Sequence, residues 1–305
     1  MIDSMAVIRD HLARLKPLQR SVERAISVAG LPRSMRKRGS VWAVTMVRNE
    51  MDIIAPVIRH LLREGADGVI AVDHQSTDGT YELLRDLASE EPRVFVGQNC
   101  SDAYHQARAM SYISRLAVKA GADWIVPFDA DEVWTAPDGT LADHLRNSRS
   151  GVVRAEIFDA FPSRDKGTLE PAIEDKLTVT SERGLMLKSA FRALSWTWVG
   201  PGNHAVTHPG PVEVSLRIIH FPYRSFEQFE RKVISGAAAI DATPGVQGEF
   251  GGHWREHASV TSAARYRLWV DYLAGSRDSD FGDSVRPRVQ IDNPLRAPYR
   301  MNCFH

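Results

Sequence analysis

The stretch Asp123–Trp134, DWIVPFDADEVW, decides how this sequence folds. Its apolar run, Trp124–Phe128, has the length and composition of a buried strand. The run ends in three carboxylates within four positions, Asp129, Asp131 and Glu132. Clustered negative charge at the end of a buried strand requires a compensating positive charge nearby.

Strand and helix patterns alternate along the chain before this stretch. Buried-strand patterns occur at Val41–Val47, Gly68–Val72 and Arg93–Val96. Apolar residues recur at helical spacing within Ile53–Leu62, Tyr81–Leu87 and Ala103–Ala120. Alternation with short connections predicts an α/β fold, with a mostly parallel central sheet and helices on both faces.

The second half of the chain is less regular. Strand patterns occur at Val152–Phe161 and Leu216–Phe221, and helical patterns at Ser225–Ile240 and Val260–Leu273. Residues 162–185 are polar with weak strand signals, residues 245–252 are rich in glycine, and the tail after Gly275 has an irregular pattern.

Charge is uneven along the chain. Residues 1–40 contain nine Lys and Arg against three Asp and Glu, a net charge of +6, so the remainder carries −6 because the whole chain is neutral. A basic amphipathic helix here would either pack loosely on the body or lie on an anionic membrane. We favour the loosely packed helix, because Pro17 interrupts a short apolar stripe.

Composition narrows the class of protein further. Overall neutrality argues against nucleic acid as the main partner. Cys100 and Cys303 are too few for a disulfide framework and lack metal-ligand spacing. With neither a membrane-length apolar segment nor a signal-peptide pattern, we expect a cytoplasmic protein, with peripheral membrane contact through residues 1–40 as the alternative.

Three polar segments follow predicted strands: Arg48–Glu50, Asp73–Thr80 and Asp129–Glu132. The carboxyl ends of parallel strands meet at one edge of a sheet, where the functional loops of such folds lie. We therefore expect these segments, which are far apart in the sequence, to be neighbours at one rim.

Asp129 and Asp131 stand two residues apart, so in extended backbone their side chains point the same way. Two carboxylates this close repel each other unless a cation lies between them. Mg²⁺ and Mn²⁺ prefer oxygen ligands, and Mg²⁺ commonly combines one or two carboxylates with substrate phosphates. We predict a divalent metal, with a diphosphate behind it; the alternative is a solvated acidic turn that caps a short helix.

The segment DHQSTDGT, Asp73–Thr80, supplies a second polar element. Ser76, Asp78 and Gly79 predict a tight turn before a helix. Its side chains could accept hydrogen bonds from a base and a ribose. The alternative is an ordinary strand-to-helix turn in which Asp78 caps the helix.

Three motifs together resemble the glycosyltransferases of family 2, which have the Rossmann-like GT-A fold. They are MVRNE at Met46–Glu50, VDHQSTDGT at Val72–Thr80 and WIVPFDADEVW at Trp124–Trp134. The chain is most similar to the bacterial branch with an R-N-E first strand end and a D-x-D-E metal motif. HFPYRSFEQFERK, His220–Lys232, is similar to a downstream histidine motif of that branch.

The resemblance implies a role for each matched position. Asp129 would approach the ribose or the metal, Asp131 would bind metal and diphosphate, and His220 would be a further metal ligand. The residues implied to lie along the nucleotide or its phosphates are Asn49, Glu50, Asp73, Asp78, Arg224, Ser225 and Lys232. Where family members commonly carry consecutive acids, this chain has Asp73-His74, so His74 is expected to stack on the base rather than accept a hydrogen bond.

The resemblance also divides the chain. Residues 1–40 would form a basic helical extension and residues 246–305 a C-terminal helical segment and tail. Residues 41–245 would form the GT-A domain, with a nucleotide-binding half at 41–135 and an acceptor half at 136–245.

The predicted function is metal-dependent transfer of a sugar from a nucleotide diphosphate donor, UDP-linked, to a hydroxyl of a glycan or other acceptor. The resemblance implies inversion by direct displacement, with a carboxylate as base. Asp159, Glu156 and Glu132 are the candidates for that base, and we choose Asp159. The alternatives are a sugar nucleotidyltransferase and a non-catalytic nucleotide- or glycan-binding module of the same fold.

Overall fold

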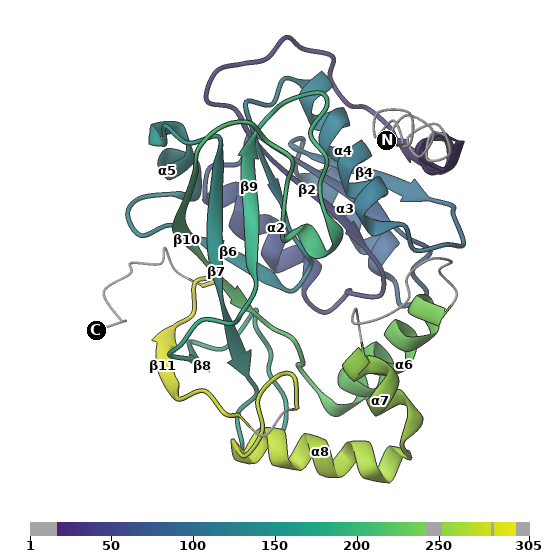
Figure 1. The fold of residues 1–305 in the computed structure, drawn as a ribbon, viewed down its shortest axis with the longest axis vertical. Helices are drawn as coiled ribbons and strands as arrows, with labels where there is room; N and C mark the ends of the chain where they lie inside the picture. The colour runs from purple at the N-terminus through teal and green to yellow at the C-terminus, as the bar shows by residue number, and fades with distance from the viewer. Residues whose placement is uncertain (1–16, 242–251, 282–283, 297–305) are drawn as a thin grey trace, which may run out of the picture.

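The computed structural model describes residues 17–241, 252–281 and 284–296 (Figure 1). The glycine-rich segment noted at residues 245–252 lies outside these ranges except for its last residue.

Four parallel strands form the first half of the central sheet, in the order β4, β3, β2, β5. They are β2 (Val41–Val47), β3 (Gly68–Asp73), β4 (Val94–Asn99) and β5 (Trp124–Pro127). Helices α2 (Ile54–Arg63), α3 (Thr80–Glu90) and α4 (Gln106–Ala120) connect them. Each of these elements overlaps a segment predicted from periodicity.

Helices cover both faces of this half of the sheet. One set of alternate β2 side chains, Val41, Ala43 and Val47, shares a core cluster with α2. The other set, Trp42, Val44 and Met46, shares a second cluster with α4. Burial on both sides explains why β2 is apolar along nearly its whole length rather than alternating.

The sheet continues beyond β5 through β9 (Leu187–Arg192), β7 (Val152–Phe161), β10 (Val212–His220) and β6 (Glu132–Thr135). Because β9 is antiparallel to both β5 and β7, strand β7 runs in the same direction as β5. Strand β10 is parallel to β7, and β6 is antiparallel to β10. The predicted α/β fold with a mostly parallel sheet is confirmed.

Several short elements carried too little sequence signal to be predicted. They are β6, β9, α5 (Leu141–Asn147), β8 (Lys176–Thr180) and β11 (Arg288–Asp292). The prediction that the tail after Gly275 is irregular was wrong for β11, which pairs antiparallel with β8. Strands of four to six residues owe their stability to partners that can lie far away in sequence.

Part of the N-terminal segment belongs to the sheet. Residues 17–25 are helical, and β1 (Ile26–Val28) pairs antiparallel with β4 at the sheet edge. Val22 and Ile26 are buried in the cluster that contains α4. The expectation of a loosely packed helix was therefore wrong for these residues, since they pack into the core.

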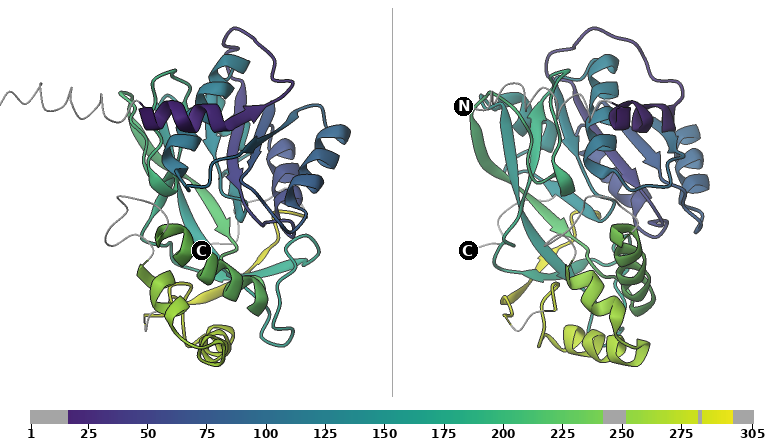
Figure 2. Two further views of the ribbon diagram at one scale, coloured as in Figure 1. Left: turned by 90° about the vertical axis from the view of Figure 1, so that its right-hand side faces the viewer. Right: turned by 45° about the vertical axis from the view of Figure 1, so that its right-hand side comes forward.

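The C-terminal helices α6 (Phe226–Asp241), α7 (Gly252–Ser259) and α8 (Ser262–Ala274) lie together at one end of the molecule (Figure 2). They surround a cluster of buried side chains that includes Phe161, Tyr223, Phe229, Trp269, Tyr272 and Phe281. Among the described helices we find none with the length and hydrophobicity that crossing a bilayer requires.

Candidate active site

The strand register brings His220 beside the acidic motif. His220 ends β10, where it lies opposite Glu132 of β6 on one side and Asp159 of β7 on the other. The backbone N–H of Phe221 donates to the carbonyl of Asp131 at 2.8 Å. This pairing of distant segments joins the two halves of the chain at one rim.

His220 lies between two carboxylates. Its Nδ1 donates to Asp159 Oδ1 at 2.6 Å, and its Nε2 is 3.6 Å from Asp131 Oδ2. Burial alone would lower the pKa of His220, but Asp131 and Asp159 raise it to about 10. The ring orientation is therefore set by Asp159, and its Nε2 faces Asp131.

Both carboxylate oxygens of Asp159 have hydrogen-bond partners. Its second oxygen, Oδ2, accepts from Arg286 Nη2 at 2.5 Å and from Ser279 Oγ at 2.7 Å. Burial would raise the pKa of Asp159, but the hydrogen bond from His220 and the nearby cations hold it below its usual range. Both oxygens of Asp159 are engaged, and Asp159 orients His220; its choice as the base stays a prediction.

Lysines compensate the charge of the acidic motif. Lys232 of α6 reaches Asp131 Oδ2 at 2.6 Å. Lys188 of β9, itself buried, lies 2.5 Å from Asp129 Oδ2 and 2.8 Å from Glu132 Oε1. Lys188 was not anticipated, because a lone lysine in a weakly patterned segment carries no motif.

The first carboxylate of the motif is held from two sides. Asp129 Oδ1 accepts from Asn203 Nδ2 at 3.0 Å, while its other oxygen faces Lys188. Asn203 ends the short helix η1 (Pro201–Asn203), is buried and has a φ of 59°. Asparagine tolerates this left-handed backbone better than most residues, which suits it to a tight turn at the rim.

The other two candidates for the catalytic base, Glu132 and Glu156, also pair with other groups of the protein. Burial raises the pKa of Glu132 to about 7, yet its oxygens face Lys188 and the backbone N–H of Asp129. Glu156 stands three residues before Asp159 on β7, so strand alternation points it to the opposite face. There it lies 3.3 Å from Arg183.

The proposed metal ligands are not all assembled. Within the described residues, no group of three or more His, Cys, Asp or Glu is arranged to hold a metal ion. Asp131 and His220 nevertheless have suitable donors: the separation of 3.6 Å is compatible with two ligands of one ion, and the other ring nitrogen is satisfied by a carboxylate. Asp129 is tied to Lys188 and Asn203 instead.

The loops after β2 and β3 brace each other. Asn49 donates its backbone N–H to Ser76 Oγ at 2.9 Å and accepts from the Thr77 N–H at 2.8 Å. Asp78 accepts from Thr80 and from the Met51 N–H. Three residues predicted to contact the nucleotide, Asn49, Ser76 and Asp78, thus have structural partners in these loops.

Asp73 keeps one oxygen free of protein partners. Its Oδ2 accepts from the Ser76 N–H at 3.1 Å, whereas its buried Oδ1 has no hydrogen-bond partner among the described residues. His74, also buried, stacks on Tyr104 with ring centroids 5.7 Å apart. Tyr104 was not anticipated in this role; it lies within the predicted helix Ala103–Ala120, whereas α4 begins at Gln106 in the structure.

The guanidinium of Arg224 is buried and is hydrogen-bonded to other groups of the protein. It is 2% exposed, and its guanidinium contacts Asp52 at 2.6 Å, Glu50 at 2.6 Å and the Phe221 carbonyl at 3.1 Å. Its hydrogen bonds join the loop after β2 to the loop after β10, and the role near the phosphates that the resemblance implied stays a prediction. Ser225 accepts from the Gln228 N–H at the start of α6.

Four aromatic side chains that could form a platform for a sugar ring, Trp196, Trp198, Phe221 and Tyr223, separate into two groups by their exposure. Phe221 and Tyr223 are buried in the core, which removes them from that role. Trp196 and Trp198 are 57% and 37% exposed, and Trp198 packs against the Arg108 guanidinium.

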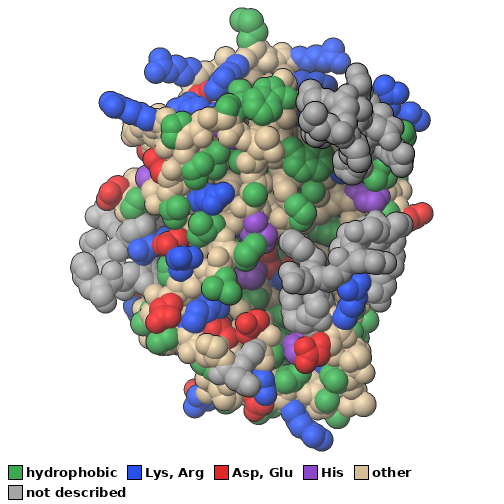
Figure 3. Space-filling model, in the orientation of Figure 1, with side chains coloured by type: hydrophobic (Ala, Val, Ile, Leu, Met, Phe, Trp, Pro, Cys, Tyr) green, Lys and Arg blue, Asp and Glu red, His purple; other side chains and the backbone are tan. Residues whose placement is uncertain are grey.

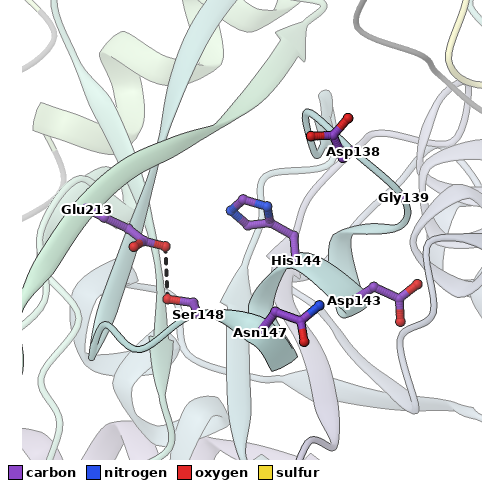
Figure 4. A pocket seen from close by; sticks show the side chains of 7 residues that line it. All are labelled: Asp138, Gly139, Asp143, His144, Asn147, Ser148 and Glu213. Carbon is purple, nitrogen blue, oxygen red and sulfur yellow. Dashed lines mark hydrogen bonds between the residues drawn. The ribbon is translucent and has the colours of Figure 1, made fainter.

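A separate surface hollow lies at the opposite end of β10. Figure 4 shows the side chains that line it: Asp138, Asp143, His144, Asn147, Ser148 and Glu213, together with Gly139. Glu213 accepts from Ser148 Oγ at 2.9 Å and lies near the first residue of β10, whereas His220 is the last. The hollow is therefore remote from the acidic rim.

The mostly parallel α/β sheet gathers carboxylates, a histidine and a lysine at the carboxyl ends of its strands, as the resemblance to the GT-A glycosyltransferases implied. The glycosyl transferase family 2 sequence model matches residues 42–205, which is more than half of the chain. The chain belongs to glycosyl transferase family 2, and it is a glycosyltransferase, as the sequence motifs predicted.

Two solved structures match the chain at low sequence identity. One is S. aureus TarS residues 1–349 in complex with UDP, 12% identical, covering 78% of this chain and 71% of that one, with a TM-score of 0.38. Another is the mannosyltransferase PcManGT from Pyrobaculum calidifontis in complex with GDP-Man and Mn²⁺, 16% identical, covering 89% and 85%, also with a TM-score of 0.38. No curated protein sequence matches the chain.

Proposed function

We propose that this glycosyltransferase takes a sugar from a UDP-linked nucleotide donor and transfers it to a hydroxyl of a glycan or other acceptor, with the help of Mn²⁺ or Mg²⁺. The observation that carries the proposal is the environment of Asp131. A buried carboxylate lies between a histidine and a lysine that remains partly exposed, at the rim where such sheets bind ligands.

Asp131 and His220 are the residues that would hold the metal. Nδ1 of His220 is satisfied by Asp159, which leaves Nε2 to face the ion, a common arrangement for metal-binding histidines. Bound there, a divalent ion would neutralise the charge that develops on the leaving diphosphate. Waters and phosphate oxygens would complete the shell, as is usual for Mg²⁺.

The diphosphate and nucleoside would extend from this point along the rim. Lys232, 24% exposed in its side chain, can exchange its contact with Asp131 for one with a phosphate oxygen. Asp73 has an unpartnered buried oxygen at the end of β3, two strands from β5. A carboxylate accepts hydrogen bonds only, so Asp73 suits a base N–H or a ribose hydroxyl.

The reaction would be a direct displacement. The acceptor oxygen forms a bond to the anomeric carbon as the bond from that carbon to the diphosphate oxygen breaks, and the bonding pair leaves with the nucleoside diphosphate. The acceptor proton passes to a base, and the configuration at the anomeric carbon inverts.

Family membership disfavours the alternative of a sugar nucleotidyltransferase. The loop after β2 also lacks the glycine-rich, cation-bearing sequence expected of such an enzyme, since residues 48–53 contain one arginine and no glycine. A non-catalytic module would bind the nucleotide without turnover, so an activity measurement separates it from an enzyme.

The test is a panel of UDP-, GDP- and other nucleotide sugars, monitored for release of the nucleoside diphosphate with Mn²⁺, with Mg²⁺ and with EDTA. We expect hydrolysis of a UDP-sugar that EDTA abolishes and that Asp131→Asn reduces by at least about 100-fold. Asp143→Asn, at an exposed carboxylate on α5, is the matched control and should keep full activity. Undiminished activity in EDTA together with unchanged activity of Asp131→Asn would contradict the proposed metal site.

A further inference from the structure

The segment between β1 and β2 forms a basic loop, residues 31–40, with the sequence LPRSMRKRGS. It arcs over the end of the molecule at which the parallel strands begin (Figure 1). The two views in Figure 2 also place it at the end opposite to α6, α7 and α8.

Hydrogen bonds hold this loop against the body of the protein. The backbone N–H of Ser34 donates to the Lys119 carbonyl at 3.2 Å, and that of Lys37 donates to the Gly121 carbonyl at 2.9 Å. Arg36 forms an ion pair with Asp123, a carboxylate that also accepts from the Gly39 N–H. The loop therefore presents its outer side chains from a supported backbone.

The outer side of the loop is cationic with an apolar residue at its centre. Arg33, Lys37 and Arg38 are exposed, residues 31–40 contain no acid, and Met35 is 90% exposed. Figure 3 shows Lys and Arg side chains around this end of the molecule, with hydrophobic atoms at its tip.

Neighbouring groups leave the positive charge largely uncompensated. Asp123 is shared between Arg36 and Arg192, so one carboxylate faces two guanidinium groups. Arg36, Arg38, Asp123 and Arg192 together line a shallow surface hollow, which could admit a phosphate group.

We propose that the basic loop docks this protein on the surface of a bilayer that contains anionic phospholipids. The cationic side chains would lie among the headgroups, and Met35 would enter the interface. Basic clusters beside an exposed apolar side chain bind membranes in this way, through electrostatic attraction and burial of apolar surface. A nucleic acid would use the charge but leave Met35 in water, and the whole chain is neutral.

Docking in this orientation keeps the acidic rim open. The basic loop precedes β2 and so lies at the amino ends of the parallel strands, whereas Asp131 and His220 lie at the carboxyl ends. The proposal does not depend on the identity of the donor, because the loop shares no described contact with the rim.

The experiment is co-sedimentation of the full chain with vesicles of phosphatidylcholine, with and without phosphatidylglycerol. The triple variant Arg33→Gln, Lys37→Gln, Arg38→Gln removes three exposed charges and spares Arg36. We expect binding only to the vesicles that contain phosphatidylglycerol, and weaker binding at high salt. Each charge should contribute about fivefold to the affinity, so the triple variant should bind on the order of 100-fold more weakly. Met35→Ser should weaken binding without changing its dependence on salt.

The matched control removes the same number of charges from the far side of the molecule. Lys166, Lys176 and Arg296 each pair with a surface carboxylate, and their replacement by Gln should leave vesicle binding unchanged. Thermal midpoints confirm that all variants are folded. Equal binding to both vesicle types, an equal loss in the control, or tighter retention of an oligonucleotide than of vesicles would overturn the proposal.

Discussion

Asp159 and His220 meet across the parallel strands β7 and β10, with Asp159 Oδ1 2.6 Å from His220 Nδ1. A carboxylate can only accept, so the ring donates from Nδ1 and its Nε2 is directed to Asp131. We therefore expect Asp159 to be a positioning residue, whose influence on activity passes through His220.

Asp159→Asn should therefore weaken metal binding. We expect Mn²⁺ affinity in the presence of UDP to fall about 10–100-fold, as when the supporting partner of a metal-binding histidine is removed. Calorimetry with Mn²⁺ measures this directly. Ser279→Ala is the control, because it removes a hydrogen bond from the other carboxylate oxygen and leaves the contact with His220 in place. A large loss of kcat at unchanged Mn²⁺ affinity would instead support Asp159 as the base.

Substitution of Arg224 should lower the stability of the fold, whereas substitution of Lys232 should weaken donor binding. Arg224→Gln leaves Glu50 and Asp52 without their buried partner, so we expect a loss of about 3–5 kcal/mol in the free energy of unfolding, measured in urea. Lys232→Gln should cost little stability but raise the KM for the donor, because this side chain is partly exposed beside Asp131. Unchanged stability with a raised KM in Arg224→Gln would show that Arg224 contacts phosphate after all.

His60 should make stability depend on pH. It is buried between the carbonyls of Trp134 and Pro294, and burial lowers its pKa from 6.5 to about 4. The unfolded chain then binds more protons between these values, so stability is present above pH 6.5 and falls as the pH drops towards about 4, by up to about 3 kcal/mol. Urea unfolding across this range checks it, and His60→Gln should flatten this part of the profile. If the free energy of unfolding of His60→Gln changed with pH as steeply as that of the parent protein, other groups would be the cause of the pH dependence.

Ile26 should stabilise the edge of the sheet. It is 5% exposed in β1, so Ile26→Ala removes buried methyl groups and we expect a loss of about 2 kcal/mol or more, measured by urea unfolding. Leu18→Ala, at a position 37% exposed in the preceding helix, should cost much less. Equal small effects would show that β1 is only loosely attached to β4.

The first half of the sheet and the acidic motif could be predicted from the sequence alone. Strand and helix periods are local properties, so Val41–Val47 and the helices that follow could be predicted from their apolar spacing. The D-x-D-E cluster at the end of β5 is likewise contiguous, and its demand for positive charge follows from electrostatics alone.

The groups that compensate the negative charge of the motif depend on the tertiary structure. Lys188, on the short strand β9, pairs with Asp129 and Glu132, and it is a single residue without a local pattern. Arg286, in the segment before β11, pairs with Asp159 and is equally without a local pattern. The sequence around Arg224 does not distinguish a phosphate partner from a carboxylate partner. In the structure, Arg224 is buried and pairs with Glu50 and Asp52. Asp159 became the support of His220 through strand register, which depends on the packing of the whole sheet rather than on neighbouring residues.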